Sequence, residues 1–156
     1  IMSTPGSADL PPPTDAAMQV LLRSPPGTAT RAQQIEQGIS ISKTLGSPEY
    51  FTVAAAKDLV VRVMNRGSYS SGASRQLVAI AADGDRSELL KTIKAPTLVI
   101  HGASDPLVPV EHGRRTAELI SHAQYLEIPM MGHALEPQIQ RQIVSELSQF
   151  YQMSGH

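Results

Sequence analysis

Two short apolar runs in the last third of the chain most constrain its fold. "TLVIH" occupies residues 97–101 and "QYLEIP" residues 124–129, and a helical pattern at 110–121 separates them. A further helix is expected at 135–151. Short apolar runs that alternate with helices indicate parallel strands, because a parallel pair needs a long crossover connection. The sequence therefore predicts an α/β segment from residue 93 onward.

Residues 14–93 indicate a succession of helices instead. The preceding stretch "PGSADLPPP", residues 5–13, is expected to be a linker, because three consecutive prolines remove backbone donors. The predicted helices are 15–23 with Thr14 as cap, a helix from Thr28 or Thr30 to Gly46, one that starts at Ser47 and Pro48 and ends in "NRG", 72–84, and 85–93 with Asp85 and Glu88 as a possible capping box. The apolar residues of this block are expected to form its own core, and some to face an acyl or alkyl pocket: Met18, Leu22, Ile35, Ile39 and Met64.

Length, charge and composition limit the classes of function. The chain has 156 residues, about one domain, and its 13 basic and 14 acidic residues give no electrostatic signal for nucleic acid or an anionic membrane. No apolar run approaches the roughly 18 residues of a membrane span. The absence of cysteine excludes disulfides and thiolate chemistry. We expect a soluble chain; its compartment stays open, with the cytoplasm favoured over secretion.

Two residues just past the predicted strand ends carry candidate chemistry. Asp105 lies four residues after His101, and His133 lies four residues after Pro129. Taken alone, an Asp before Pro is a turn former, and a loop histidine often has a structural role. Together they lie where loops of neighbouring parallel strands emerge side by side. A carboxylate that accepts from one imidazole nitrogen fixes the tautomer, so that the other nitrogen can take a proton from a hydroxyl.

The segments "IKAPTLVIHGASDPLVPVEHG" and "LEIPMMGH" resemble the C-terminal part of the α/β-hydrolase superfamily, in its esterase and lipase-like branch with a helical cap. The resemblance implies the α/β-hydrolase fold, with Asp105 as the triad acid and His133 as the triad base. Neither a cofactor nor a metal is expected. The resemblance also implies an organisation into the end of a core strand and a linker at 1–10, a helical cap at 11–92, and a C-terminal α/β core segment at 93–156.

A nucleophile of the family's G-x-S-x-G type is not found in the sequence. "GISIS" at 38–42 ends in Ser42 and follows no strand, and "GSYSSG" at 67–72 has Tyr69 at the nucleophile position. We therefore expect the N-terminal half of the sheet, with its Ser, to be missing from this chain. A companion polypeptide, the N-terminal segment of the same protein, is expected to supply it, and the chain alone is expected to be inactive.

Other candidate residues carry weaker signals. His101 could lie near the pocket, although a structural role is favoured, and the spacing of His112, His122 and His156 does not suit a metal. Val108, Met130 and Met131 could form apolar walls around the imidazole or belong to the core.

Hydrolysis of a small-molecule carboxylic ester is the function that the resemblance favours. The same scaffold also serves epoxide hydrolases, dehalogenases, cofactor-free peroxidases and prolyl aminopeptidases. A non-catalytic binding module remains the alternative from another class.

Overall fold

The computed structural model describes residues 4–23, 28–67 and 72–154. Its elements in chain order are α1 (Asp15–Leu22), α2 (Arg31–Leu45), α3 (Val53–Arg66), α4 (Gly72–Asp83), α5 (Ser87–Lys91), β1 (Leu98–Gly102), α6 (Val110–Leu119), β2 (Gln124–Ile128) and α7 (Pro137–Met153). Four predicted features lie outside these ranges: the strand end at 1–3, the chain break at 24–27, Tyr69 and the terminal His156. None of the helices within them is long and apolar enough to cross a bilayer.

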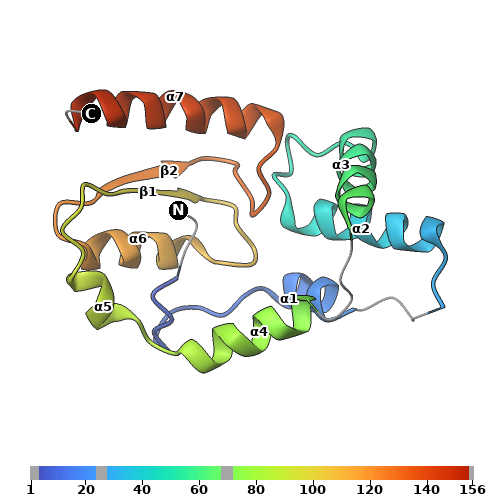
Figure 1. Cartoon of the computed structure of the whole chain (residues 1–156), viewed down its shortest axis with the longest axis horizontal. Helices are drawn as coiled ribbons and strands as arrows, with labels where there is room; N and C mark the ends of the chain where they lie inside the picture. Colours follow the sequence, from blue (N-terminus) through green and yellow to red (C-terminus); the bar gives the residue numbers. More distant parts are fainter. Residues whose placement is uncertain (1–3, 24–27, 68–71, 155–156) are drawn as a thin grey trace.

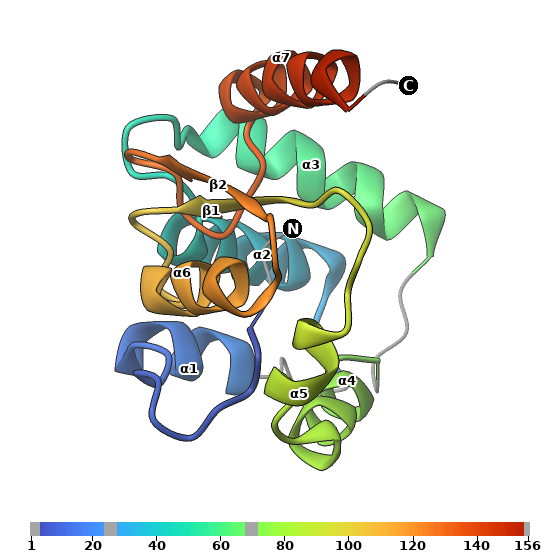
Figure 2. The same cartoon turned by 90° about the vertical axis from the view of Figure 1, so that its left-hand side faces the viewer.

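The two strands form a parallel pair, as the sequence predicts. The register runs from Leu98 opposite Gln124 to Gly102 opposite Ile128. Helix α6 makes the crossover between the strands, and α7 follows β2. These two helices cover opposite faces of the pair (Figures 1 and 2). The α/β segment predicted from residue 93 onward is thus present, with the strand pair lying between two helices.

Alternation along β1 divides its side chains between the two layers. Ile100 belongs to a buried cluster with Ile128, Met131 and Ile139 of α7. The neighbouring His101 is also fully buried, but its ring packs against α6, where a Cβ at Gly113 would lie 2.5 Å from the imidazole. Met131 is therefore a core residue, the second of the two roles considered for it.

Helices α2 and α3 pack side by side beyond one end of the strands (Figure 1). They approach closely at Gly38, where a Cβ would lie 2.7 Å from both methyl groups of Val60. Leu22 is 62% exposed, so the expectation that it belongs to a core of the helical block is wrong within the described chain. Met18, Ile35, Ile39 and Met64 are partly buried.

Several predicted helix boundaries hold, and three helices start or are capped differently than predicted. Thr14 and Thr30 cap their helices through the side chain, Thr30 in a capping box with Gln33, and Gly46 ends α2. Helix α3 begins at Val53 and not at Pro48, and Thr52 caps it by accepting from the N–H of Ala55.

The other two errors are at α5 and α7. Asp85 does not form a capping box with Glu88: its carboxylate accepts from the N–H and the hydroxyl of Ser87, and Glu88 pairs with Lys91. Helix α7 begins two residues later than expected, with Pro137 in its first turn.

The Ile128→Ala substitution tests the core between β2 and α7. Ile128 is 1% exposed, so its truncation leaves a cavity and is expected to lower the free energy of unfolding by about 2–5 kcal/mol. Urea unfolding measures the change. Val144→Ala on α7 is the control: Val144 is 62% exposed, and its truncation is expected to change the free energy by no more than about 0.5 kcal/mol. Equal effects of the two substitutions would contradict this core.

Candidate functional site

Asp105 lies three residues after the last residue of β1 and its carboxylate is fully buried. Its Oδ1 atom accepts from the backbone N–H groups of Leu107 and Val108, each at 2.9 Å. These two bonds shape the turn after β1, so Asp105 is the turn former that its position before a proline suggests. They leave the second oxygen, Oδ2, to face another partner.

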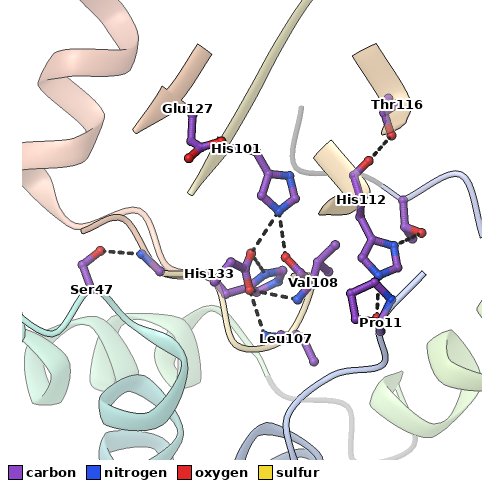
Figure 3. A network of polar contacts seen from close by, with 12 residues as sticks. Pro11, Ser47, His101, Leu107, Val108, His112, Thr116, Glu127 and His133 are labelled. Atoms are coloured by element: carbon purple, nitrogen blue, oxygen red, sulfur yellow. Dashed lines mark hydrogen bonds and ion pairs between the residues drawn. The ribbon is translucent and has the colours of Figure 1, made fainter. Parts of the chain in front are cut away.

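That partner is His133. Nδ1 of His133 lies 2.8 Å from Oδ2 of Asp105 (Figure 3). An ionised carboxylate only accepts hydrogen bonds, so the proton of a neutral His133 ring lies on Nδ1 and Nε2 keeps its lone pair. The His133 side chain is 30% exposed, and within the described part of the chain no hydrogen bond reaches Nε2. The ring is thus held at one nitrogen and available at the other.

The strand register brings the two loops together. Beyond the last paired residues, the N–H of Ala103 donates to Ile128 O at 3.1 Å and the N–H of Ser104 donates to Met131 O at 3.0 Å. Gly102 allows this approach, because a Cβ there would overlap the carbonyl oxygen of Met131. Both loops therefore leave the same edge of the sheet in direct backbone contact.

Burial raises the pKa of the Asp105 carboxyl, because a buried charge loses its hydration. The hydrogen bond from His133 and the backbone N–H groups of Val108 and Leu107 lower it, and together they outweigh burial. The pKa of Asp105 is therefore held below 3.8, its ordinary value. At neutral pH the carboxyl is ionised and can stabilise a proton on His133.

His101 lies beside Asp105. Its Nε2 donates to the carbonyl of Val108 at 2.7 Å, and the same nitrogen is 3.9 Å from Oδ2 of Asp105. Its Nδ1 is buried and has no partner among the described residues. The contact supports the Val108 turn that donates to Asp105, which agrees with the structural role favoured for His101.

The remaining histidines lie elsewhere. His112 on α6 bonds Thr4 Oγ1 at 2.6 Å through Nδ1 and the carbonyl of Pro11 at 2.8 Å through Nε2, so it ties the segment before α1 to α6. His122 is exposed in the turn after α6. Met130, 37% exposed, comes just before buried Met131 in the loop that leads to His133. Between residues 4 and 154, apart from the two undescribed gaps, no cluster of three or more His, Cys, Asp or Glu could hold a metal ion.

The sequence interpretation missed two residues near His133. Ser47 was expected only to start a helix, and Glu136 was given no role. In the structure their side chains bond each other across 89 positions of the chain, and Ser47 also bonds Gly132, the residue before His133. No local sequence pattern predicts this contact, because both partners are ordinary loop residues in the sequence.

Comparison with known families agrees with this architecture. The profile of the alpha/beta hydrolase fold family matches residues 8–135. The chain belongs to this family. The resemblance stated from the strand-end motifs is thereby confirmed for the family and its fold, and hydrolases and esterases are among its relatives.

Individual relatives differ in chemistry. The bifunctional esterase/perhydrolase DCH of Acinetobacter calcoaceticus is 36% identical over 52 residues, 33% of this chain and 19% of that protein. The dihydrolipoyllysine-residue acetyltransferase component of the acetoin cleaving system of Pseudomonas putida is 26% identical over 154 residues, 92% of this chain and 40% of that protein.

Among solved structures, the meta-cleavage product hydrolase CumD of Pseudomonas fluorescens IP01 superposes with a TM-score of 0.69 at 19% identity, covering 99% of this chain and 55% of that one. The chain therefore spans about half, or less, of the length of these relatives.

The lowered pKa of Asp105 predicts how stability depends on pH. A carboxyl whose pKa is lower when folded stabilises the fold above its unfolded-state pKa, and this contribution is lost as the pH falls through the folded value, below 3.8. Asp105→Asn is expected to be less stable than wild type at pH 6, and to lose less stability between pH 6 and pH 3.

Urea unfolding at the two pH values measures both effects. Asp58→Asn serves as control, because Asp58 pairs with Arg62 on the exposed surface of α3. A wild-type pH dependence in the Asp105 variant would contradict the assignment.

Proposed function

We propose that the protein containing this chain hydrolyses small-molecule carboxylic esters through a Ser-His-Asp triad, with His133 as base and Asp105 as acid. The hydrogen bond of 2.8 Å between Nδ1 and Oδ2 carries the proposal, together with the Nε2 atom of a side chain that is 30% exposed, which no hydrogen bond reaches among the described residues. This is the geometry that lets an imidazole accept a hydroxyl proton while a carboxylate fixes its tautomer.

The reaction proceeds in two stages. In the first, Nε2 of His133 takes the proton of the Ser hydroxyl while its oxygen bonds the ester carbonyl carbon; the alkoxy group then leaves as an alcohol with that proton, and an acyl-enzyme remains. In the second, His133 takes a proton from water, the hydroxide oxygen bonds the acyl carbon, and the acid leaves as Ser regains its proton. Asp105 stays ionised throughout and stabilises the imidazolium.

The Ser and the donors of the oxyanion hole are proposed to come from a segment outside this chain. The chain spans 55% of the CumD chain, and its two strands pair only with each other in the described residues. The unpaired outer edges of a parallel pair are sites where further strands can add. Side chains of α7 such as Val144 and Tyr151, 62% and 59% exposed, provide apolar surface beside that sheet.

The cytoplasmic location expected from the sequence stays a prediction.

Ester hydrolysis is favoured over the other chemistries of the scaffold by the esterase named among the relatives. An Asp nucleophile would instead indicate an epoxide hydrolase or a dehalogenase. A Ser nucleophile beside a different pocket would indicate a peroxidase or an aminopeptidase. The acid–base pair serves all of them, so the identity of the nucleophile and the substrate tested distinguish them.

Asp105→Asn and His133→Ala test the triad in the protein that joins this chain to its nucleophile-bearing segment. Turnover of short and medium nitrophenyl esters is expected to fall by about 10⁴-fold in the Asp105 variant, because the wrong tautomer then faces the nucleophile, and at least as far in the His133 variant. Asp58→Asn and His122→Ala, at exposed positions, are the matched controls and should keep wild-type rates. Retention of activity in both site variants, with folding verified by circular dichroism, would refute the proposal.

The chain by itself is expected to hydrolyse none of these esters and to regain turnover when the nucleophile-bearing segment is added. Size exclusion and intact-mass measurement are expected to find that segment bound noncovalently. A stable species of 16.7 kDa that binds a ligand without a companion would instead favour the binding-module alternative.

A further inference from the structure

The loop that carries His133 is bonded to the end of α2. The backbone N–H groups of two consecutive residues donate to it: Gly132 to Ser47 Oγ at 3.0 Å and His133 to the carbonyl of Leu45 at 2.6 Å. Figure 3 shows Ser47 reaching this loop from the side opposite His101. The last carbonyls of a helix lack intrahelical partners, so the end of α2 offers acceptors where the loop offers donors.

Ser47 also bonds the far side of the same loop. It is fully buried; its hydroxyl donates to Glu136 Oε2 at 2.7 Å and its N–H donates to Glu136 Oε1 at 2.8 Å. Glu136 precedes α7, yet its side chain does not cap that helix. Ser47 therefore holds the loop on both sides of His133, at Gly132 before it and at Glu136 after it. Hydrogen bonds to a carboxylate are among the stronger ones.

The backbones of the two segments are in direct contact. A Cβ at Gly132 would overlap the carbonyl oxygen of Gly46 and would lie 2.7 Å from that of Leu45. A Cβ at Gly46 would in turn lie 2.6 Å from Oε1 of Glu136. The loop therefore has no space to shift toward α2, and a movement of the α2 end toward the loop would displace it.

We propose that Ser47 and Glu136 are positioning residues for His133. The hydrogen bonds of Ser47 with Gly132 and Glu136, together with the bond from His133 to Leu45, form a latch. Through this latch the end of α2 holds the imidazole against Asp105. The inference rests on the proposed function, because it concerns the base of that triad. It goes further in assigning part of the control of the base to α2, a helix of the segment expected to be the cap. A displacement of α2 by substrate or by the companion segment would then reach His133 directly.

The rate at which the His133 ring proton exchanges with water reports how firmly the latch holds the ring against Asp105. In the 156-residue chain labelled with ¹⁵N-histidine, NMR observes the Nδ1–H that donates to Asp105, and loss of this signal in Asp105→Asn assigns it. Ser47→Ala removes the acceptor of the Gly132 N–H and is expected to speed exchange of the ring proton about tenfold, the order of one lost hydrogen bond. Ser40→Ala, exposed on α2, is the control and should leave exchange unchanged.

Glu136→Gln provides a second variant that keeps the volume and one oxygen. Its amide replaces one of the two oxygens that accept separately from the N–H and the hydroxyl of Ser47 with an NH₂ donor, so a smaller increase in the same direction is expected. This variant decides the test if Ser47→Ala does not fold. A lower melting temperature with wild-type exchange of the ring proton would mean a merely structural role and would overturn the latch. If Asp105→Asn leaves the ring signal in place, the acid–base pair of the proposed function fails, and the latch with it.

Discussion

The parallel register of β1 and β2 is the constraint on which the rest of the structure depends. Because Gly102 lies opposite Ile128, the chain leaves both strands at one edge, and the acid and the imidazole start from adjacent positions. A slip of one residue would turn Ile128 out of the core and separate the two loops. The core contacts of Ile100 and Ile128 with α7 fix the register, so packing and site geometry have a common cause.

The two halves of the acid–base pair are supported in different ways. Asp105 is held locally, by N–H groups two and three residues ahead, and His101 of the preceding strand bonds the carbonyl of Val108 in the same turn. His133 lies on a loop whose backbone donors bond Leu45, the last residue of α2, and Ser47 just after that helix, more than eighty residues earlier. The acid is therefore organised by short-range contacts, and the base depends on how the helical segment docks against the strands.

This difference explains which features the sequence could reveal. Asp105 follows an apolar run and precedes a proline, so both its turn and its position at a strand end could be predicted. The start of α3 could not: Pro48 is a favourable first helical residue, but buried Ser47 is occupied by Glu136, and the chain turns before Thr52 caps the helix. A tertiary contact overrode the local preference there. The link between Ser47 and the loop of His133 could not be predicted for the same reason, because it also depends on a contact between distant parts of the chain.

The sequence by itself determined the parallel α/β unit, the positions of Asp105 and His133 just past the strand ends, and the family to which the motifs pointed. These follow from local rules, since apolar periodicity, caps and turn residues act within a few positions. Only the tertiary structure decided that Met131 belongs to the core, that His101 supports the turn of Asp105, and that α2 bonds the loop of His133. Such contacts join residues distant in the chain, and their geometry exists only once the layers have packed.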